Sequence, residues 1–191
     1  MHIHTLRETR ATPEADIRAF TEAMSRTAAG VCIVTTNGPH GRFGLTVSSM
    51  TSVSAEPPML LVCVNRSSVA HDAIRENGRF AINALAAHQQ QIASTFAGRS
   101  PSGRHYEFNS GDWAALSGLP RLLDASAFFD CKLLSALESG SHTIFVGSVE
   151  TASAGDDPAL LYSERNYGYA ARLGRKACPT GTDSVLERTL Q

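Results

Sequence analysis

The sequence has no long apolar run, no excess of charge of either sign and few cysteines. Its 17 basic residues oppose 18 acidic ones, so the formal net charge is −1 at pH 7. Without a positive surplus, the chain has no general attraction for nucleic acid or for an anionic membrane surface. No stretch reaches the roughly 18 apolar residues that a membrane-spanning helix needs. We therefore expect neither nucleic acid nor a membrane among the partners.

The cysteines indicate neither a metal site nor a redox motif. The four, Cys32, Cys63, Cys131 and Cys178, are scattered, with no CxxC pair and no histidine at metal-ligand spacing. Three lie in apolar runs, where cysteine acts as a small hydrophobe. The polar residues 1–10 lack the apolar segment of a signal peptide. We expect no bound metal and a cytoplasmic location.

Length and composition predict one globular domain. The chain has 191 residues, of which 42% are apolar and 18% charged, an ordinary balance for a folded protein. Residues 1–11 and 175–191 lack periodicity, and the second of these segments carries helix-breaking residues. We expect flexible tails there and a folded domain over residues 12–174.

Strand-like segments dominate the predicted domain. The first element is a helix that starts with Thr12 as N-cap and ends at Gly30, with Ile17, Phe20, Met24 and Ala28 at helical spacing. Residues 59–64 are apolar at every position, which predicts a strand buried on both faces. Strands are expected at 31–36, 43–47, 59–64, 80–85, 127–133 and 143–149; short helices at 69–77, closed by Gly78, and 88–96; a long loop over 101–120; and a polar loop around Tyr167 and Tyr169.

This pattern predicts a mainly β fold with a few helices, arranged as an antiparallel barrel. The alternation of strand and helix that builds a Rossmann domain is absent, and so is its GxGxxG motif.

A hydroxyl-rich strand is the first candidate binding segment. Thr46, Ser48 and Ser49 surround Val47 in the stretch from Gly44 to Ser52. Hydroxyls and main-chain groups beside apolar walls suit the polar edge of a flavin ring. From composition alone, however, an edge strand of a barrel wall is the more common explanation of such a segment.

A second candidate lies between a strand and a helix start. Asn65, Arg66, Ser67 and Ser68 precede Val69, and free N–H groups at a helix N-terminus attract anions such as phosphate. Ser67 or Ser68 acting only as a helix cap explains the same residues equally well.

Four aromatic side chains complete the candidates. His142, at the turn of the last long hairpin, is suited to hydrogen-bond a nicotinamide amide or to carry a proton, although an exposed turn histidine without a role is more common. Phe96 is either a core residue or a shield for a bound ring. Tyr167 and Tyr169, on either side of Gly168, are candidate pocket residues.

Taken in order, these segments resemble the short-chain flavin reductases, which are the reductase components of two-component flavin-dependent monooxygenases. The resemblance runs from about Phe20 to Gly168. It rests on Ala28 to Thr36, Gly44 to Ser49, Ser54 to Asn65, Phe80 to Leu85, Gly111-Asp112-Trp113 and His142 to Gly147.

The resemblance implies a Greek-key, FMN-binding split barrel and a homodimer with FMN or FAD near the subunit interface. It places the flavin ring and ribityl chain on Thr46, Val47, Ser48 and Ser49, and Phe96 beside the ring. It places the phosphate near Asn65, Ser67, Ser68 and Ala70, His142 near the nicotinamide of NADH or NADPH, and Tyr167 at the same pocket.

Three positions depart from the family pattern. Ala70 stands where the family often has threonine, which removes one phosphate contact. Ser141 replaces an aspartate beside His142, and Glu107 replaces a basic residue before Phe108. These changes leave the preference between FMN and FAD open.

The implied activity is hydride transfer from NADH or NADPH to flavin, with reduced flavin diffusing to a partner monooxygenase. Two alternatives remain at this point: a non-catalytic flavin-binding electron carrier on the same barrel, and a related oxidase of a phosphorylated pyridoxal-type substrate. The second alternative needs a more basic pocket than this sequence offers.

Overall fold

The computed structural model describes residues 16–99 and 106–171, and these form a mainly β fold with antiparallel sheets and three α-helices. The helices are α1 (Ile17–Ser25), α2 (His71–Asn77) and α3 (Gln90–Phe96), the last preceded by a 3-10 turn, Ala87–Gln89. The predicted tails, the predicted cap Thr12 and Cys178 lie outside the described residues. No helix in the described part of the chain is both long and apolar enough to cross a membrane.

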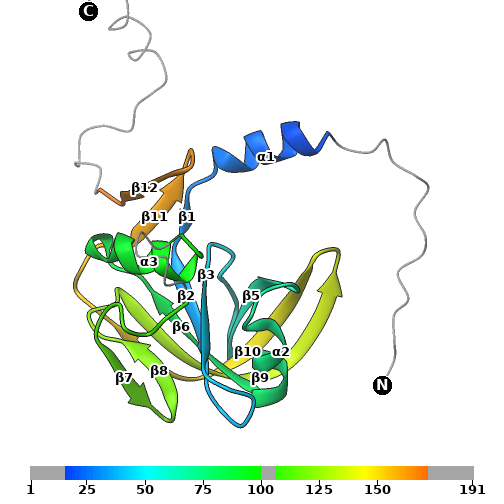
Figure 1. Ribbon diagram of the computed structural model, residues 1–191, viewed down its shortest axis with the longest axis vertical. Helices are drawn as coiled ribbons and strands as arrows, with labels where there is room; N and C mark the ends of the chain where they lie inside the picture. Colours follow the sequence, from blue (N-terminus) through cyan, green and yellow to red (C-terminus); the bar gives the residue numbers. More distant parts are fainter. Residues whose placement is uncertain (1–15, 100–105, 172–191) are drawn as a thin grey trace, which may run out of the picture.

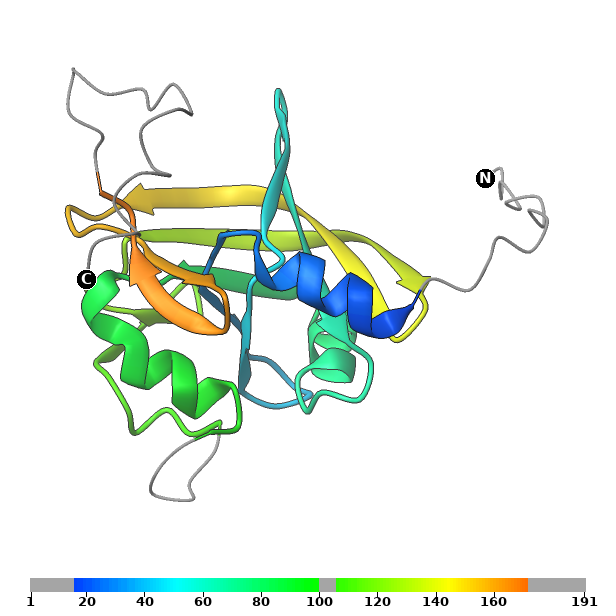
Figure 2. The ribbon, with the colours of Figure 1, turned by 90° about the horizontal axis from the view of Figure 1, so that it is seen from above.

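One curved sheet of seven strands forms most of the molecule (Figures 1 and 2). Its strand order is β3-β2-β6-β9-β10-β5-β4, and every neighbouring pair is antiparallel. A second sheet has the order β1-β11-β12, and β7 and β8 form a separate hairpin. The bounds are β1 Ala29–Gly30, β2 Cys32–Thr36, β3 Phe43–Val47, β4 Thr51–Ala55, β5 Pro58–Asn65, β6 Arg79–Ala84, β7 Trp113–Leu116, β8 Leu119–Leu122, β9 Ala127–Ser139, β10 His142–Ala154, β11 Leu160–Ser163 and β12 Asn166–Tyr169.

Strand β2 separates two hydrophobic clusters and is buried along its whole length. Cys32 and Val34 belong to a cluster around Phe80 and Phe145. Val31, just before the strand, and Ile33 belong to a second cluster, whose other members are Leu85, Ala93, Phe96, Leu122 and Leu160. Burial raises the pKa of the Cys32 thiol to about 12, so this cysteine is a packing residue.

The six predicted strands are all present, and α2 ends as expected at Gly78, which has a φ of 66°. The prediction for β5 was wrong in one respect. Leu60, Val62 and Val64 are buried, but Met59, Leu61 and Cys63 on the other face are only half-buried. The described chain therefore covers one face of this strand, even though its sequence is apolar throughout.

Two segments predicted as loops are hairpins. Trp113–Leu116 pairs with Leu119–Leu122, and the turn uses Ser117 and Gly118, both with positive φ. Asn83 Oδ1 accepts a hydrogen bond from the Leu122 backbone N–H at 2.7 Å, which holds this hairpin on β6. Tyr167 and Tyr169 lie in strand β12, which pairs with β11, and not in a polar loop.

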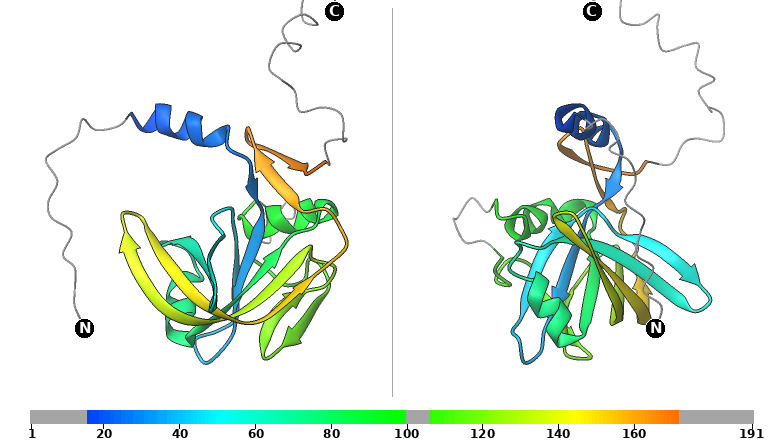
Figure 3. Two further views of the ribbon diagram at one scale, coloured as in Figure 1. Left: turned by 180° about the vertical axis from the view of Figure 1, so that it is seen from behind. Right: turned by 90° about the vertical axis from the view of Figure 1, so that its right-hand side faces the viewer.

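The first helix also differs from the prediction. It ends at Ser25 and not at Gly30, and none of its residues is buried. Ile17, Phe20 and Met24, which the sequence places at helical spacing, are exposed by 76%, 60% and 52%. The helix stands clear of the main sheet (Figures 1 and 3), so its apolar side contacts no core in the described chain.

Candidate functional site

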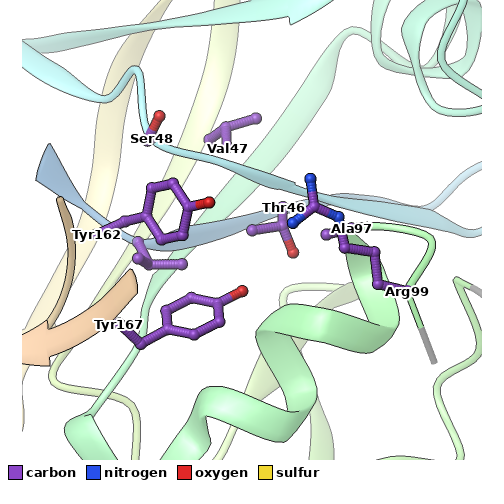
Figure 4. A pocket seen from close by; sticks show the side chains of 8 residues that line it. Thr46, Val47, Ser48, Ala97, Arg99, Tyr162 and Tyr167 are labelled. Carbon is purple, nitrogen blue, oxygen red and sulfur yellow. The ribbon is translucent and has the colours of Figure 1, made fainter. Parts of the chain in front are cut away.

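Two adjoining pockets share Thr46, Val47 and Ser48, at the end of strand β3. The first, called here the His142 pocket, has a volume of about 270 Å³ and is also lined by Leu45, Ser49, Cys63, Asn65 and His142. The second, called the Arg99 pocket, has a volume of about 240 Å³ and is also lined by Val31, Ala97, Arg99, Tyr162 and Tyr167 (Figure 4). The hydroxyl-rich segment predicted from the sequence thus lies where the two pockets meet.

The His142 pocket is built by two strands that are far apart in the sheet order. Strand β3 is one edge of the sheet, while β5 lies near the other edge. Ser49 joins them, because its Oγ donates to the Cys63 carbonyl at 2.9 Å and accepts from the Cys63 N–H at 3.0 Å. His142 and Asn65 are direct cross-strand partners between β10 and β5. The curvature of the sheet therefore brings six of the predicted residues to one pocket: Thr46, Val47, Ser48, Ser49, Asn65 and His142.

The three hydroxyl groups of the segment Thr46–Ser49 have different partners. Thr46 Oγ1 donates to the Ala93 carbonyl at 2.8 Å and thereby holds helix α3 against β3. Ser49 holds β5, as described above. Ser48 is exposed and has no side-chain hydrogen bond within the described residues, so its hydroxyl is free to meet a ligand.

The predicted phosphate site, Asn65 to Ser68, is called here the Ser68 corner, and it contains a buried polar atom without a hydrogen-bond partner in the described chain. Asn65 Oδ1 accepts from the Ser67 N–H at 2.9 Å and from the Ser67 hydroxyl at 2.8 Å. The hydroxyl of Ser68 is buried and has no partner in the described chain. Neither serine caps helix α2, whose N-cap is Ala70 without any side-chain cap. The cap explanation of these serines is therefore wrong, and no contact within the described chain accounts for the buried Ser68 hydroxyl.

The cations near this corner are already paired. Glu138 binds Arg75 at 3.0 Å and Arg66 at 3.5 Å, and these two arginines lower the pKa of its carboxyl group. The corner consequently offers hydroxyl and amide donors to an anion, with most of its positive charge already compensated.

His142 is exposed, and its Nδ1 lies 2.9 Å from the hydroxyl of Ser141. The side chain of the next residue, Thr143, points to the other face of the strand and is buried. A neutral hydroxyl thus occupies the position of the carboxylate that the family pattern places beside this histidine.

Four of the predicted residues line neither pocket: Ser67, Ser68, Ala70 and Phe96. Phe96 is 1% exposed and belongs to the second core cluster. Its ring packs edge-to-face on Phe108 and Trp113, at centroid distances of 5.1 and 5.5 Å. Ala70 is fully buried beside α2. A role of Phe96 or Ala70 in binding would be exerted through the position of its neighbours.

Sequence reasoning missed Arg99 and Tyr162. The aromatic rings of Tyr162 and Tyr167 lie 5.3 Å apart, because these residues are direct partners across the β11–β12 hairpin. In Figure 4 both phenol hydroxyls point toward the side of the pocket where Thr46 and Arg99 lie. Leu160 and Tyr162, two positions apart, were the available signal in the sequence for strand β11. No local motif distinguishes Arg99 from the other arginines.

The donor set fits a flavin nucleotide. Ser48 and the end of β3 offer polar groups to a heteroaromatic edge, Val47 and Leu45 offer an apolar wall, and Asn65 brings the start of the predicted phosphate segment to the same pocket.

Comparison with known proteins agrees with this assignment. The sequence profile of the flavin reductase like domain matches residues 24–171. The chain is 44% identical over 170 residues to a Methylorubrum extorquens protein named FMN reductase (NADH) RutF 1, covering 88% of this chain and 83% of the relative.

Solved structures give the same picture. A Streptomyces globisporus NADH:FAD oxidoreductase, SgcE6, in complex with NAD and FAD fragments, superposes with a TM-score of 0.74 at 30% identity, over 88% of this chain and 99% of that one. BorF, the flavin reductase component of a bacterial two-component tryptophan halogenase, has a TM-score of 0.72 at 34% identity, over 83% of this chain and 100% of its own.

Proposed function

Because the chain belongs to the flavin reductase like family, we propose that it transfers a hydride from a reduced nicotinamide dinucleotide to FMN at the junction of the two pockets. The observation that carries this proposal is the position of Thr46–Ser49, where one pocket holds His142 and the other holds Arg99. NADH and FMN are the expected pair, since they are the substrates in the name of the relative that is 44% identical.

The protein contributes binding and orientation, and the bound flavin supplies the hydride acceptor. Ser48 and the end of β3 hold the polar edge of the ring, and Val47 packs against its face. Asn65, Ser67 and Ser68 hold the phosphate, and Phe96 supports β3 from the core. His142 donates a hydrogen bond to the nicotinamide amide, and Tyr167 closes the opposite side. The reaction consumes one proton from solvent, and NADH, FMN and H⁺ become NAD⁺ and reduced FMN.

The family resemblance also supports inferences about the barrel, the partner enzyme and the cellular compartment. We infer that the curved sheet completes a split barrel of Greek-key type within a single folded domain, and that reduced flavin diffuses to a partner monooxygenase. BorF is the flavin reductase component of such a two-component pair. The buried, unpaired thiols of Cys32 and Cys131 support a reducing compartment, the cytoplasm.

We also infer a homodimer. Helix α1 has nine residues and buries none of them, and so short a helix is not stable in water without packing. Leu134 and Leu137, at the far end of β9, are exposed by 53% and 63%. A second copy of the chain would cover these apolar surfaces and the half-buried face of β5.

The deciding experiment is a steady-state assay of the purified protein. NADH and NADPH are each combined with FMN, FAD and riboflavin, and loss of nicotinamide absorbance is followed, with reactions lacking protein or flavin as controls. We expect flavin-dependent oxidation that is fastest with NADH and FMN. Absence of oxidation at excess flavin would refute the proposal, and firmly bound flavin without turnover would instead indicate an electron carrier.

A further inference from the structure

Arg99 is the one cationic side chain that lines either pocket in the described chain. It has no ion pair with a described residue, and no carboxylate lines either pocket. Arg66 and Arg75, near the Ser68 corner, both bind Glu138. Among the described residues, the unpaired positive charge that lines the site is therefore that of Arg99 in the Arg99 pocket.

The fold fixes the backbone of Arg99. Helix α3 ends in a Schellman motif, in which the Gly98 N–H donates to the Thr95 carbonyl at 3.2 Å and the Arg99 N–H donates to the Ser94 carbonyl at 2.9 Å. Gly98 has the positive φ, 72°, that this motif requires. Thr46 holds the same helix turn through Ala93. Arg99 is thus attached to the strand that is expected to carry the flavin.

The surroundings of Arg99 suit a phosphate ester next to an aromatic or sugar group. The hydroxyls of Tyr162 and Tyr167 point toward the side where its guanidinium lies (Figure 4), and Ser48 adds a third hydroxyl group. A guanidinium with several neutral donors is the usual composition of a phosphate site.

We propose that Arg99, Tyr162 and Tyr167 form a phosphate subsite for a bound substrate, and that its occupant is the diphosphate of the nicotinamide dinucleotide. The segment from Asn65 to Ser68, whose first residue lines the His142 pocket, would provide for the phosphate of the flavin. The reaction thereby has two phosphate-bearing substrates and two separate places for their phosphates. This inference rests on the proposed function, and it deepens that function by assigning the residue that distinguishes phosphorylated substrates.

The test compares each phosphorylated substrate with its counterpart that lacks the phosphate or the second nucleotide. Arg99→Ala and the matched control Lys132→Ala, an exposed residue of β9 that lines neither pocket, each remove one positive charge. Dissociation constants for FMN and riboflavin come from flavin fluorescence, and KM values are measured for NADH and for reduced nicotinamide mononucleotide.

We expect Arg99→Ala to raise the KM for NADH roughly tenfold, as for the loss of one charge-assisted hydrogen bond, and to change the value for the mononucleotide less than about twofold. Arg99→Lys should recover part of the loss, since it keeps the charge but not the paired donors. Selective weakening of FMN relative to riboflavin would keep the subsite and assign it to the flavin phosphate.

The subsite would be overturned if Arg99→Ala weakened FMN and riboflavin equally, and NADH and the mononucleotide equally. It would also be overturned if Arg99→Ala had no greater effect than Lys132→Ala. The binding measurements need no turnover, so a wild-type protein that binds flavin but does not oxidise NADH would refute the proposed reaction without deciding the role of Arg99.

Discussion

The Nε2 atom of His71 lies 2.8 Å from the Oγ1 atom of Thr143, and both side chains are buried. This hydrogen bond joins the first residue of α2 to the second residue of β10, next to His142. The Nδ1 atom of His71 lies 2.7 Å from the carboxylate of Asp72, and its ring packs at 5.5 Å on Phe145. This interior contact adds to the direct pairing of Asn65 with His142 in holding the segment before α2 against the start of β10.

Replacing Thr143 with valine should destabilise the fold. The substitution keeps the shape but leaves a buried imidazole nitrogen without its partner, at an expected cost of about 1–2 kcal/mol in the free energy of unfolding. Urea denaturation of the variant measures this loss. Thr151→Val, an exposed position on the same strand, is the control and should change stability by less than about 0.5 kcal/mol. Similar results for the two variants would contradict the contact.

Replacing His142 with alanine should weaken use of the nicotinamide substrate. We expect the KM for NADH to rise about fivefold to tenfold, the value of one hydrogen bond to the amide, while the dissociation constant of FMN changes little. His88→Ala, another exposed histidine that lines neither pocket, is the control. Unchanged kinetics in His142→Ala would remove this residue from the site.

Replacing Ser68 with alanine should separate ligand binding from stability. Its hydroxyl has no partner in the described chain, so its loss should not destabilise the protein by more than about 0.5 kcal/mol. If the hydroxyl binds the flavin phosphate, the dissociation constant of FMN should rise about fivefold and that of riboflavin should stay the same. Titration of both flavins, with Ser52→Ala as the control, checks this. A loss of stability without a change in FMN affinity would show that Ser68 has a structural role only.

The apolar side of α1 offers a test of the dimer. Wild-type protein should sediment at twice its chain mass of 20.4 kDa, and Phe20→Asp or Leu137→Asp should shift it toward the monomer, because each places a charge in the expected interface. Leu123→Asp, which alters an exposed leucine directly after β8, is the control and should remain a dimer. A monomeric wild-type protein would disprove the dimer directly.

An element of this fold could be predicted from the sequence when its own residues determine it, and not when contacts with distant residues do. Strands β2 and β6 were predictable because their apolar residues are sufficient to identify them. The β7–β8 hairpin was not, since Gly118, Pro120 and the preceding polar residues are typical of a loop, and the strands are held by contacts such as that of Asn83 with Leu122.

The residues of the candidate site also divide into those that the sequence identifies and those that distant elements bring into place. The segment Thr46–Ser49 and His142 could be identified from the resemblance, and the structure brings them to one pocket. Arg99 could not, because its position depends on the end of α3 and on the distant hairpin that carries Tyr162 and Tyr167. The exposed side of α1 could not be foreseen either, since its helical spacing of apolar residues is the same whether they face a core or another molecule.

Trp113 is the single tryptophan of the chain, and it packs on Phe96 and Phe108, whose rings lie next to Gly44 of strand β3. The emission band of an indole overlaps the near-ultraviolet absorption of oxidised flavin, so a flavin held at Thr46–Ser49 lies within range for resonance energy transfer. The protein therefore contains its own optical probe. Quenching of its intrinsic fluorescence will follow occupancy of the site in real time, and its recovery will report the moment at which the flavin departs.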